Sequence, residues 1–214
     1  MRLLISLALL VLALNSINCK KQIIDNININ KYRSFYLTQD QLKAQIATDP
    51  NTLNCPTINQ YYETMAYNGS LALNTTLSSH NYVSIKFDAV FTNVAKVMGG
   101  VNKQAQIIVN GNITAFSANV NSNYCNPQAG KADGKTTFTL VQAHSGDLNM
   151  VFNPTNIGGI ARLGISNIQV DAYQCGQNAE LNSTTLTCVC SQGFAEALTV
   201  KLSQGPIYYI KQCI

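Results

Sequence analysis

Side chains able to do acid–base or nucleophilic chemistry are scarce in this 214-residue chain, which holds two histidines and ten acidic residues. His80 and His144 both lie in predicted turns, and Ser145-Gly146-Asp147 follows His144 directly. A Ser/His/Asp arrangement for nucleophilic catalysis is therefore conceivable. However, the chain has no G-x-S-x-G elbow, and neighbours in one turn seldom point into a shared site. We expect His144 to be a solvated turn residue.

Paired carboxylates are equally poorly supported. The two carboxyl groups of a glycoside hydrolase would have to come from distant residues such as Glu63 and Asp88, and Asp88 is more simply an outward polar residue of its strand. The stretch 130–136 imitates a phosphate loop, but only three residues separate its glycines and a strand follows it. We expect a β-turn there. The sequence predicts no catalytic residue, metal ligand or cofactor.

Cysteines carry the clearest chemical signal. Removal of Cys19 with a leader leaves six, an even number typical of disulfides in an oxidising compartment: Cys55, Cys125, Cys175, Cys188, Cys190 and Cys213. The sequence alone does not choose their pairing, although Cys188 and Cys190 are too close to pair comfortably with each other. A zinc site on the last four is the rival interpretation, which the lack of paired C-x-x-C spacing disfavours.

The N-terminus predicts secretion. Met1-Arg2 precedes a largely apolar run from Leu3 to Leu14, which is too short for a membrane anchor and typical of a signal peptide cleaved near Cys19. We therefore expect an extracellular protein with no membrane span. Only 11% of the residues are charged and the net charge is +4, without a basic cluster beyond Lys20-Lys21, so nucleic-acid binding is unsupported.

Hydrophobic alternation predicts an all-β protein. A capping box at Thr38 and Gln41 indicates one short helix, and after Cys55 the apolar period becomes two. The cleanest predicted strand runs from Val83 to Phe91, and Asn110-Gly111 predicts a hairpin. A parity slip in the strand 162–173 indicates a bulge near Ser166-Asn167.

These patterns predict an antiparallel, jelly-roll-like β-sandwich over residues 55–174. A signal peptide (1–19) and a linker with the short helix (20–54) would precede it, and a small disulfide-rich tail (175–214) would follow. Four N-glycosylation sequons stand at Asn68, Asn74, Asn112 and Asn182. Asn68 and Asn74 share a parity opposite to Leu71 and Leu73, which indicates the solvated side of a strand.

Five short segments resemble a known family. They are Asn54-Cys55-Pro56, residues 85–91, residues 107–111, residues 163–168, and Cys188-Val189-Cys190-Ser191-Gln192-Gly193-Phe194. Together they resemble ciliate secreted or surface proteins in which a jelly-roll, lectin-like β-sandwich precedes a cysteine-rich tail similar to EGF-like and furin-like repeats. The resemblance covers Cys55 to Cys190 and implies extracellular recognition.

One departure from that family concerns calcium. Its members often carry an acidic, Trp-containing loop after the central strand, but residues 92–103 contain no acid and the chain has no Trp. Stacking on a sugar ring would have to use tyrosines. The candidates are Tyr61, Tyr62, Tyr124, Tyr208 and Tyr209, although ordinary core and rim positions explain them as well.

The sequence thus predicts a secreted, non-catalytic glycoprotein that acts in extracellular recognition or as a structural surface or matrix component. Its expected partners are other extracellular proteins or glycans, with self-association through exposed strand edges as a further option. Two alternatives stay open. A lipid carrier would need the two sheets to part around an apolar cavity, and a secreted hydrolase would need perturbed Asp, Glu or His side chains in one cleft.

Overall fold

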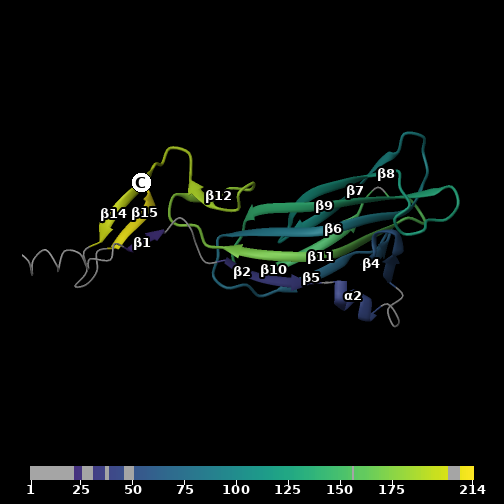
Figure 1. The fold of residues 1–214 in the computed structure, drawn as a ribbon, viewed down its shortest axis with the longest axis horizontal. Helices are drawn as coiled ribbons and strands as arrows, with labels where there is room; N and C mark the ends of the chain where they lie inside the picture. Colours follow the sequence, from purple (N-terminus) through teal and green to yellow (C-terminus); the bar gives the residue numbers. More distant parts are fainter. Residues whose placement is uncertain (1–21, 26–30, 37–38, 46–50, 156, 202–207) are drawn as a thin grey trace, which may run out of the picture. The chain divides into compact units, whose positions relative to one another are not determined.

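The computed structural model describes residues 22–25, 31–36, 39–45, 51–155, 157–201 and 208–214. The predicted signal peptide, 1–19, lies outside the described residues. The chain divides into two compact units, one of residues 30–174 and one that combines residues 1–29 with 175–214 (Figure 1). No helix in the described part of the chain is long and apolar enough to span a membrane.

The larger unit is an antiparallel β-sandwich, as the sequence predicts. One sheet has the order β3-β4-β11-β6-β9, with β2 also paired to β11, and the other has the order β5-β10-β7-β8. The strands are β2 (Lys31–Tyr36), β3 (Thr52–Cys55), β4 (Gln60–Ala66), β5 (Leu71–Thr75), β6 (Tyr82–Ala95), β7 (Val101–Val109), β8 (Asn112–Val120), β9 (Lys131–Ala143), β10 (Leu148–Pro154) and β11 (Arg162–Tyr173).

The predicted alternation holds in the central strands. In β6, Val83 to Phe91 buries every second residue completely, and the ladder with β9 is long. Asn110 and Gly111 both have positive φ, 47° and 89°, and join β7 to β8 as a tight hairpin. The predicted bulge in β11 is also present, because its register against β6 shifts between Ser166 and Gln169.

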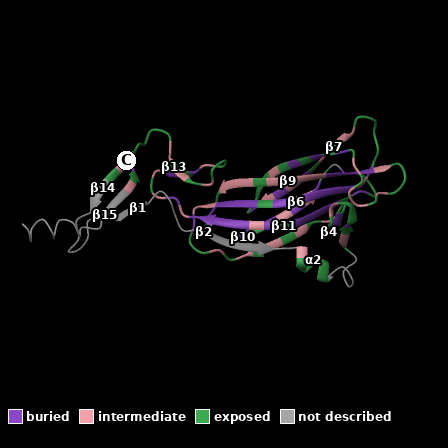
Figure 2. Ribbon diagram, in the orientation of Figure 1, coloured by how far each residue is buried: buried purple, intermediate pink, exposed green. Residues whose placement is uncertain are grey.

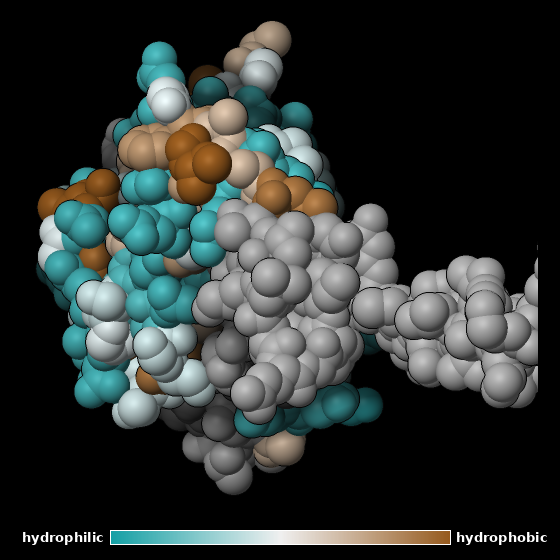
Figure 3. Space-filling model, turned by 90° about the vertical axis from the view of Figure 1, so that its left-hand side faces the viewer, coloured by the Kyte–Doolittle hydropathy of each residue, from teal (hydrophilic) through white to brown (hydrophobic). Residues whose placement is uncertain are grey.

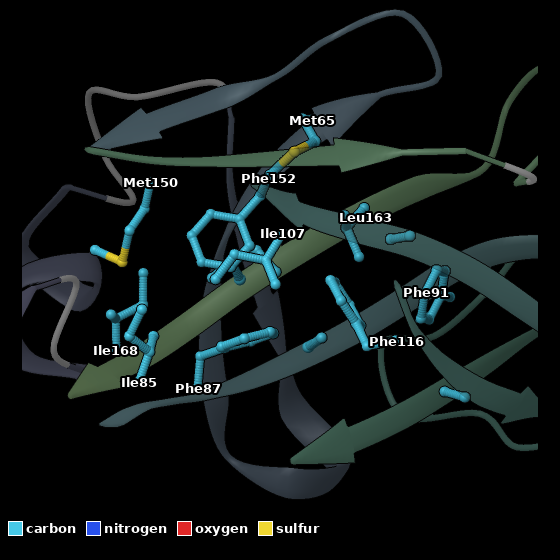
Figure 4. Close-up of a cluster of buried hydrophobic side chains, with 14 of the residues drawn as sticks. Met65, Ile85, Phe87, Phe91, Ile107, Phe116, Met150, Phe152, Leu163 and Ile168 are labelled. Carbon is cyan, nitrogen blue, oxygen red and sulfur yellow. The ribbon is translucent and has the colours of Figure 1, made fainter. Parts of the chain in front are cut away.

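The core lies between the two sheets and is built around aromatic rings. Phe87 of β6 contacts Phe116 and Phe152 of the facing sheet at centroid distances of 5.0 and 4.9 Å, both edge to face. Phe138 lies 5.6 Å from both Phe87 and Phe116. Figure 4 shows the rings of Phe87, Phe116 and Phe152 among aliphatic side chains of both sheets, including Ile85 and Ile107. Figure 2 shows the buried residues concentrated along β6 and β11.

One detail of the sequence prediction differs from the structure. Asn68 and Asn74 do not belong to one strand, because the chain turns at Tyr67-Asn68 between β4 and β5, which belong to different sheets. The turn at Ser145-Gly146-Asp147 likewise connects β9 of one sheet to β10 of the other. Alternation gives the face of each strand but does not identify its hydrogen-bonded neighbour.

The segment 20–54 contributes more than the expected linker and helix. The predicted helix is present as α2 (Gln39–Gln45), which buries Leu42 completely. Gln39 fixes it to the sheet, since its Nε2 donates to the Tyr61 carbonyl and its Oε1 accepts from the Tyr61 backbone N–H. The same segment also supplies β2 and β3 of the sandwich, and β1 (Gln22–Asp25) of the smaller unit.

Small sheets and two disulfides form the smaller unit. β1 pairs in parallel with β15 (Tyr208–Cys213), which pairs with β14 (Glu196–Lys201), and β12 (Ala179–Leu181) pairs with β13 (Cys188–Cys190). Disulfides join Cys175 to Cys188 and Cys190 to Cys213, so the two cysteines of β13 have different partners. The third disulfide, between Cys55 and Cys125, lies in the sandwich.

Close approach of β8 and β9, where the two sheets meet, depends on Gly134. A Cβ atom there would lie 2.6 Å from the Asn119 backbone oxygen and 2.8 Å from Val120 Cγ2. Because backbone must move to relieve that contact, we expect Gly134→Ala to lower the free energy of unfolding by about 1–3 kcal/mol in urea titrations. Gly159→Ala is the matched control, since its Cβ would meet nothing within 4 Å. Equal stability of the two variants would contradict this account.

Candidate ligand-binding pocket

The two histidines suggested by the sequence meet in the structure, although not as a catalytic site. His80 Nε2 and His144 Nδ1 are 2.7 Å apart, and the rings stack at a centroid distance of 5.0 Å. Both side chains are buried, so the expectation that His144 is solvated is wrong. Ser145 and Asp147 are exposed beside it. The path of the chain explains the error: the β9–β10 connection crosses from one sheet to the other beside the loop that holds His80, where the His144 backbone N–H donates to the Asn81 carbonyl.

Hydrogen bonding fixes the tautomers of this pair. His80 Nδ1 lies 2.6 Å from the Ser78 carbonyl oxygen, which can only accept, so Nδ1 carries the proton. The neutral His80 Nε2 then accepts from His144 Nδ1–H. His144 Nε2 is buried without a hydrogen-bond partner. The pair therefore ties two loops together and holds no carboxylate of a catalytic triad.

Asp88 and Glu63 do not form a catalytic pair. In the strand register, Glu63 and Ala89 lie opposite Ile165, whereas Asp88 lies opposite Ser166, so the two carboxyl side chains point to opposite faces of the sheet. Because the two groups cannot flank one bond, the hydrolase alternative loses the dyad that the sequence suggested.

The Asp88 carboxylate is occupied by structural hydrogen bonds. Its Oδ2 accepts from Gln60 Nε2 at 2.6 Å and from Asn167 Nδ2 at 2.8 Å, and its Oδ1 accepts from Thr137 Oγ1. Burial acts to raise its pKa, but these hydrogen bonds and the charge of Lys135 outweigh burial and lower the pKa of Asp88. The carboxylate stays ionised and braces β4, β6, β9 and β11 on the outer face of the larger sheet.

Asp133 organises the loop end of the sandwich, a role that the sequence did not suggest. Residues 130–136 are a turn only at their start, because β9 begins at Lys131 and the Asp133 side chain is fully buried. Its Oδ1 accepts from the Asn93 backbone N–H at 3.1 Å, and its Oδ2 accepts from the Cys125 backbone N–H at 2.7 Å. Burial raises the pKa of Asp133, and the backbone N–H groups partly oppose that rise.

The tyrosines suggested for sugar stacking differ in how far their side chains are exposed to solvent. Tyr62 is fully buried under the Cys55–Cys125 disulfide and Val90, so it offers no face to a ligand. Tyr61 and Tyr124 are half-buried. The side chains of Tyr208 and Tyr209 lie outside the described residues.

A pocket of about 200 Å³ lies where β6 ends and β7 and β9 begin. Its walls come from residues within 93–103, from Lys131 and from 157–161. Val94, Ile157 and Ala161 line it with buried apolar atoms, each no more than 3% exposed. Val97 and Ile160, more than half exposed, lie at its rim. The segment 92–103, which lacks the acidic residues of the resembled family, is thus part of this pocket.

Two lysines are the only charged side chains that line the pocket. Lys103 comes from β7 and Lys131 from the first residue of β9, where it lies opposite Ala95 in the ladder. No ion pair engages either lysine within the described residues. Neither Asp, Glu nor His lines this pocket, and the described residues contain no group of three or more His, Cys, Asp or Glu that could hold a metal ion. The pocket can bind a ligand but has no acid–base pair.

Sequence reasoning missed this pocket because its walls are assembled from three separate segments. One signal was available in the sequence. Gly99-Gly100 come shortly before β7 and Gly158-Gly159 shortly before β11, and a pair of glycines is typical of a turn between strands. Gly99, Gly100 and Gly158 have φ values of 83°, 80° and 83°. The lysines themselves carry no recognisable spacing.

Comparison with known proteins gives a distant likeness in fold. No family model matches the chain, and no curated protein matches it. Among solved structures, it is similar to the CBM36-1 domain of a multidomain xylanase from the hindgut metagenome of Trinervitermes trinervoides (11% identity, TM-score 0.36, covering 67% of this chain and 97% of that one). It is also similar to a family 35 carbohydrate-binding module from Clostridium thermocellum (15%, TM-score 0.36, 67% and 98%).

A GH115 4-O-methyl-alpha-glucuronidase with specificity for decorated arabinogalactans is matched over 70% of this chain, but over only 18% of that chain, at 8% identity and a TM-score of 0.36. All three TM-scores are below 0.5 and all three identities are below 25%. The likeness is therefore distant, and it assigns neither a ligand nor an activity.

The buried histidine pair makes stability depend on pH. Burial, followed by the charge of His80, lowers the pKa of His144, so below about pH 6.5 the unfolded chain binds more protons than the folded one. This part of the stability is present above that pH and is lost as the pH falls through the interval between the unfolded and folded pKa values. We expect the urea midpoint to fall between about pH 7 and about pH 5, and His144→Gln to flatten that fall. An unchanged pH profile in His144→Gln would refute the assignment.

Proposed function

We propose that this protein is a secreted, non-catalytic recognition module that binds glycans through the pocket at the loop end of its sandwich. The pocket itself is the observation that carries the proposal. It is open to solvent, it combines apolar side chains with amide and ammonium groups, and no Asp, Glu or His lines it. Such a combination of an apolar surface and a few polar groups is typical of a binding site.

The size of the pocket favours one sugar ring at a time. Its volume of about 200 Å³ is below the range of about 300–1,000 Å³ that is usual for sites that enclose a drug-sized ligand. A single ring could lay its C–H face on the exposed apolar side chains of Val97 and Ile160 while the rest of a glycan chain continues into solvent. The resemblance to ciliate secreted or surface proteins with a lectin-like sandwich points the same way.

The two alternatives have less support. A hydrolase would need perturbed carboxyl groups that converge on a cleft, whereas the carboxylates of Asp88 and Asp133 are occupied by structural hydrogen bonds. A lipid carrier would need an apolar space between the sheets, whereas Phe87, Phe116 and Phe152 are in contact there. Opening that space would separate the aromatic pairs that hold the sandwich together.

The surface suits an extracellular glycoprotein. Asn68, Asn74 and Asn112 are exposed and Asn182 is partly exposed, so we propose that these sequons accept N-glycans. Figure 3 shows one face of the molecule on which hydrophilic residues predominate and hydrophobic residues lie in separate patches. The three disulfides also suit an oxidising compartment.

A structural role in a surface coat or matrix is the second candidate. It is favoured by exposed apolar side chains of the smaller unit, where Phe194 is 44%, Leu198 49% and Ile214 66% exposed. β14 is also the edge strand of its sheet and offers backbone hydrogen-bonding groups to another chain.

A pocket-blocking variant tests the proposal. Gly159 lines the pocket, and a Cβ there meets nothing within 4 Å, so Gly159→Leu starts its side chain in open space and adds bulk to the pocket wall. We expect the secreted wild-type protein to bind a subset of a glycan microarray, and Gly159→Leu to lose about tenfold or more in affinity for those glycans.

Ser79→Leu is the matched control. Ser79 is an exposed residue before the start of β6, whereas the pocket lies at the end of that strand, so the control should bind as the wild type does. Binding of no glycan by the wild type, or equal binding by Gly159→Leu, would sink the proposal.

A further inference from the structure

The pocket is lined by positively charged side chains and by no negatively charged one, although the chain has few charged residues. Lys103 and Lys131 both line it, each is partly buried, and neither forms an ion pair within the described residues. The exposed residue Lys96, next to the pocket-lining residues Ala95 and Val97, carries a third ammonium group. Its backbone N–H donates to the carbonyl oxygen of Gly130, the residue before Lys131. Partial burial reduces screening by solvent, so two such charges favour an anion more than two freely solvated lysines would.

Asp133, two residues after Lys131 in the chain, does not line the pocket. Its two carboxyl oxygens accept the backbone N–H groups of Asn93 and Cys125. Burial also raises its pKa, which weakens its hold on a full negative charge. The pocket therefore presents positive charge to a ligand, and the negative charge of Asp133 is directed into the loop scaffold.

The remaining lining limits the ligand to a small group that is partly apolar. Val97 and Ile160 provide exposed apolar carbon atoms over a floor of buried apolar residues, and Asn93 provides an amide. A ligand that satisfies both parts has an apolar ring face and an anionic substituent. A free inorganic anion would leave the apolar lining without a partner, and a neutral sugar would leave the two ammonium groups without one.

We propose that the pocket selects an acidic sugar residue, one that carries a carboxylate or a sulfate ester, and that Lys103 and Lys131 bind the anionic group without a calcium ion. This inference rests on the proposed function and specifies its ligand class. Each lysine supplies a charge-assisted hydrogen bond to an anionic oxygen. The calcium ion that an acidic loop would hold is replaced here by fixed ammonium groups of the chain.

Titration of the ¹⁵N-labelled, full secreted chain with three methyl glycosides tests the inference. The probes are methyl glucuronide, methyl glucoside 6-sulfate and the neutral methyl glucoside, each with and without EDTA. We expect the two anionic probes to bind at least about fivefold more tightly than the neutral one, with chemical-shift changes in 93–103 and 157–161. EDTA should change nothing, and about 0.5 M salt should reduce the preference.

Charge-removing variants assign the effect to the two lysines. Lys103→Gln and Lys131→Gln should each lower the affinity for the anionic probes more than the affinity for the neutral glucoside, and so reduce the preference. Lys86→Gln is the control, because Lys86 is an exposed lysine of β6 that does not line the pocket. It should bind all three probes as the wild type does.

The outcomes separate this inference from the function on which it rests. Equal affinity for the anionic and neutral glucosides, or an anionic preference that persists in Lys103→Gln and Lys131→Gln, would overturn the inference and leave glycan binding intact. A preference abolished by EDTA would overturn its calcium-free part. Failure of the wild-type protein to bind these probes and every glycan of the microarray would overturn both.

Discussion

The contact between the two sheets is the constraint on which the rest of the sandwich depends. Phe87 lies against Phe116 and Phe152 of the facing sheet, and the alternating residues of β6 are completely buried around it. Burial of a phenylalanine contributes about 1.5–3 kcal/mol, so this cluster fixes how the sheets face each other. With the sheets fixed, the ends of β6, β7 and β9 meet at one edge, and loops that are distant in sequence become neighbours. The candidate pocket is a product of that packing.

Polar side chains then hold the loops in place at both ends of the sandwich. Asp133 binds a backbone N–H group near the end of β6 and one in the loop at Cys125, beside the pocket, and the His80–His144 pair ties the loops at the start of β6 and the end of β9. Asp133 and the two histidines are buried, so their side chains make hydrogen bonds within the protein in place of hydrogen bonds to water. Three groups that catalysis might have used, Asp88, Asp133 and His144, serve the scaffold. The pocket is left with ammonium and amide groups, which suit binding more than bond cleavage.

Most of the fold could be predicted from the sequence, because strand faces and turns are local properties. The alternation from Val83 to Phe91, the Asn110-Gly111 hairpin and the bulge near Ser166 all depend on neighbouring residues and appear in the structure. Strand pairing is not local, and Asn68 and Asn74 were therefore assigned to one strand although a turn separates them. The site was harder still. The burial of His144 and the convergence of Lys103 and Lys131 depend on segments far apart in the chain, and neither has a spacing that a sequence alone reveals.

The central claim is that recognition takes place in the pocket at the loop end. The most direct measurement is a backbone chemical-shift map of the secreted protein in the presence of the glycan that it binds most tightly on a microarray. Our account predicts that the perturbed amides lie within 93–103, 131 and 157–161, around the lysines and the apolar lining. Perturbations confined to the outer face around Asp88, or to the disulfide-rich unit, would contradict it.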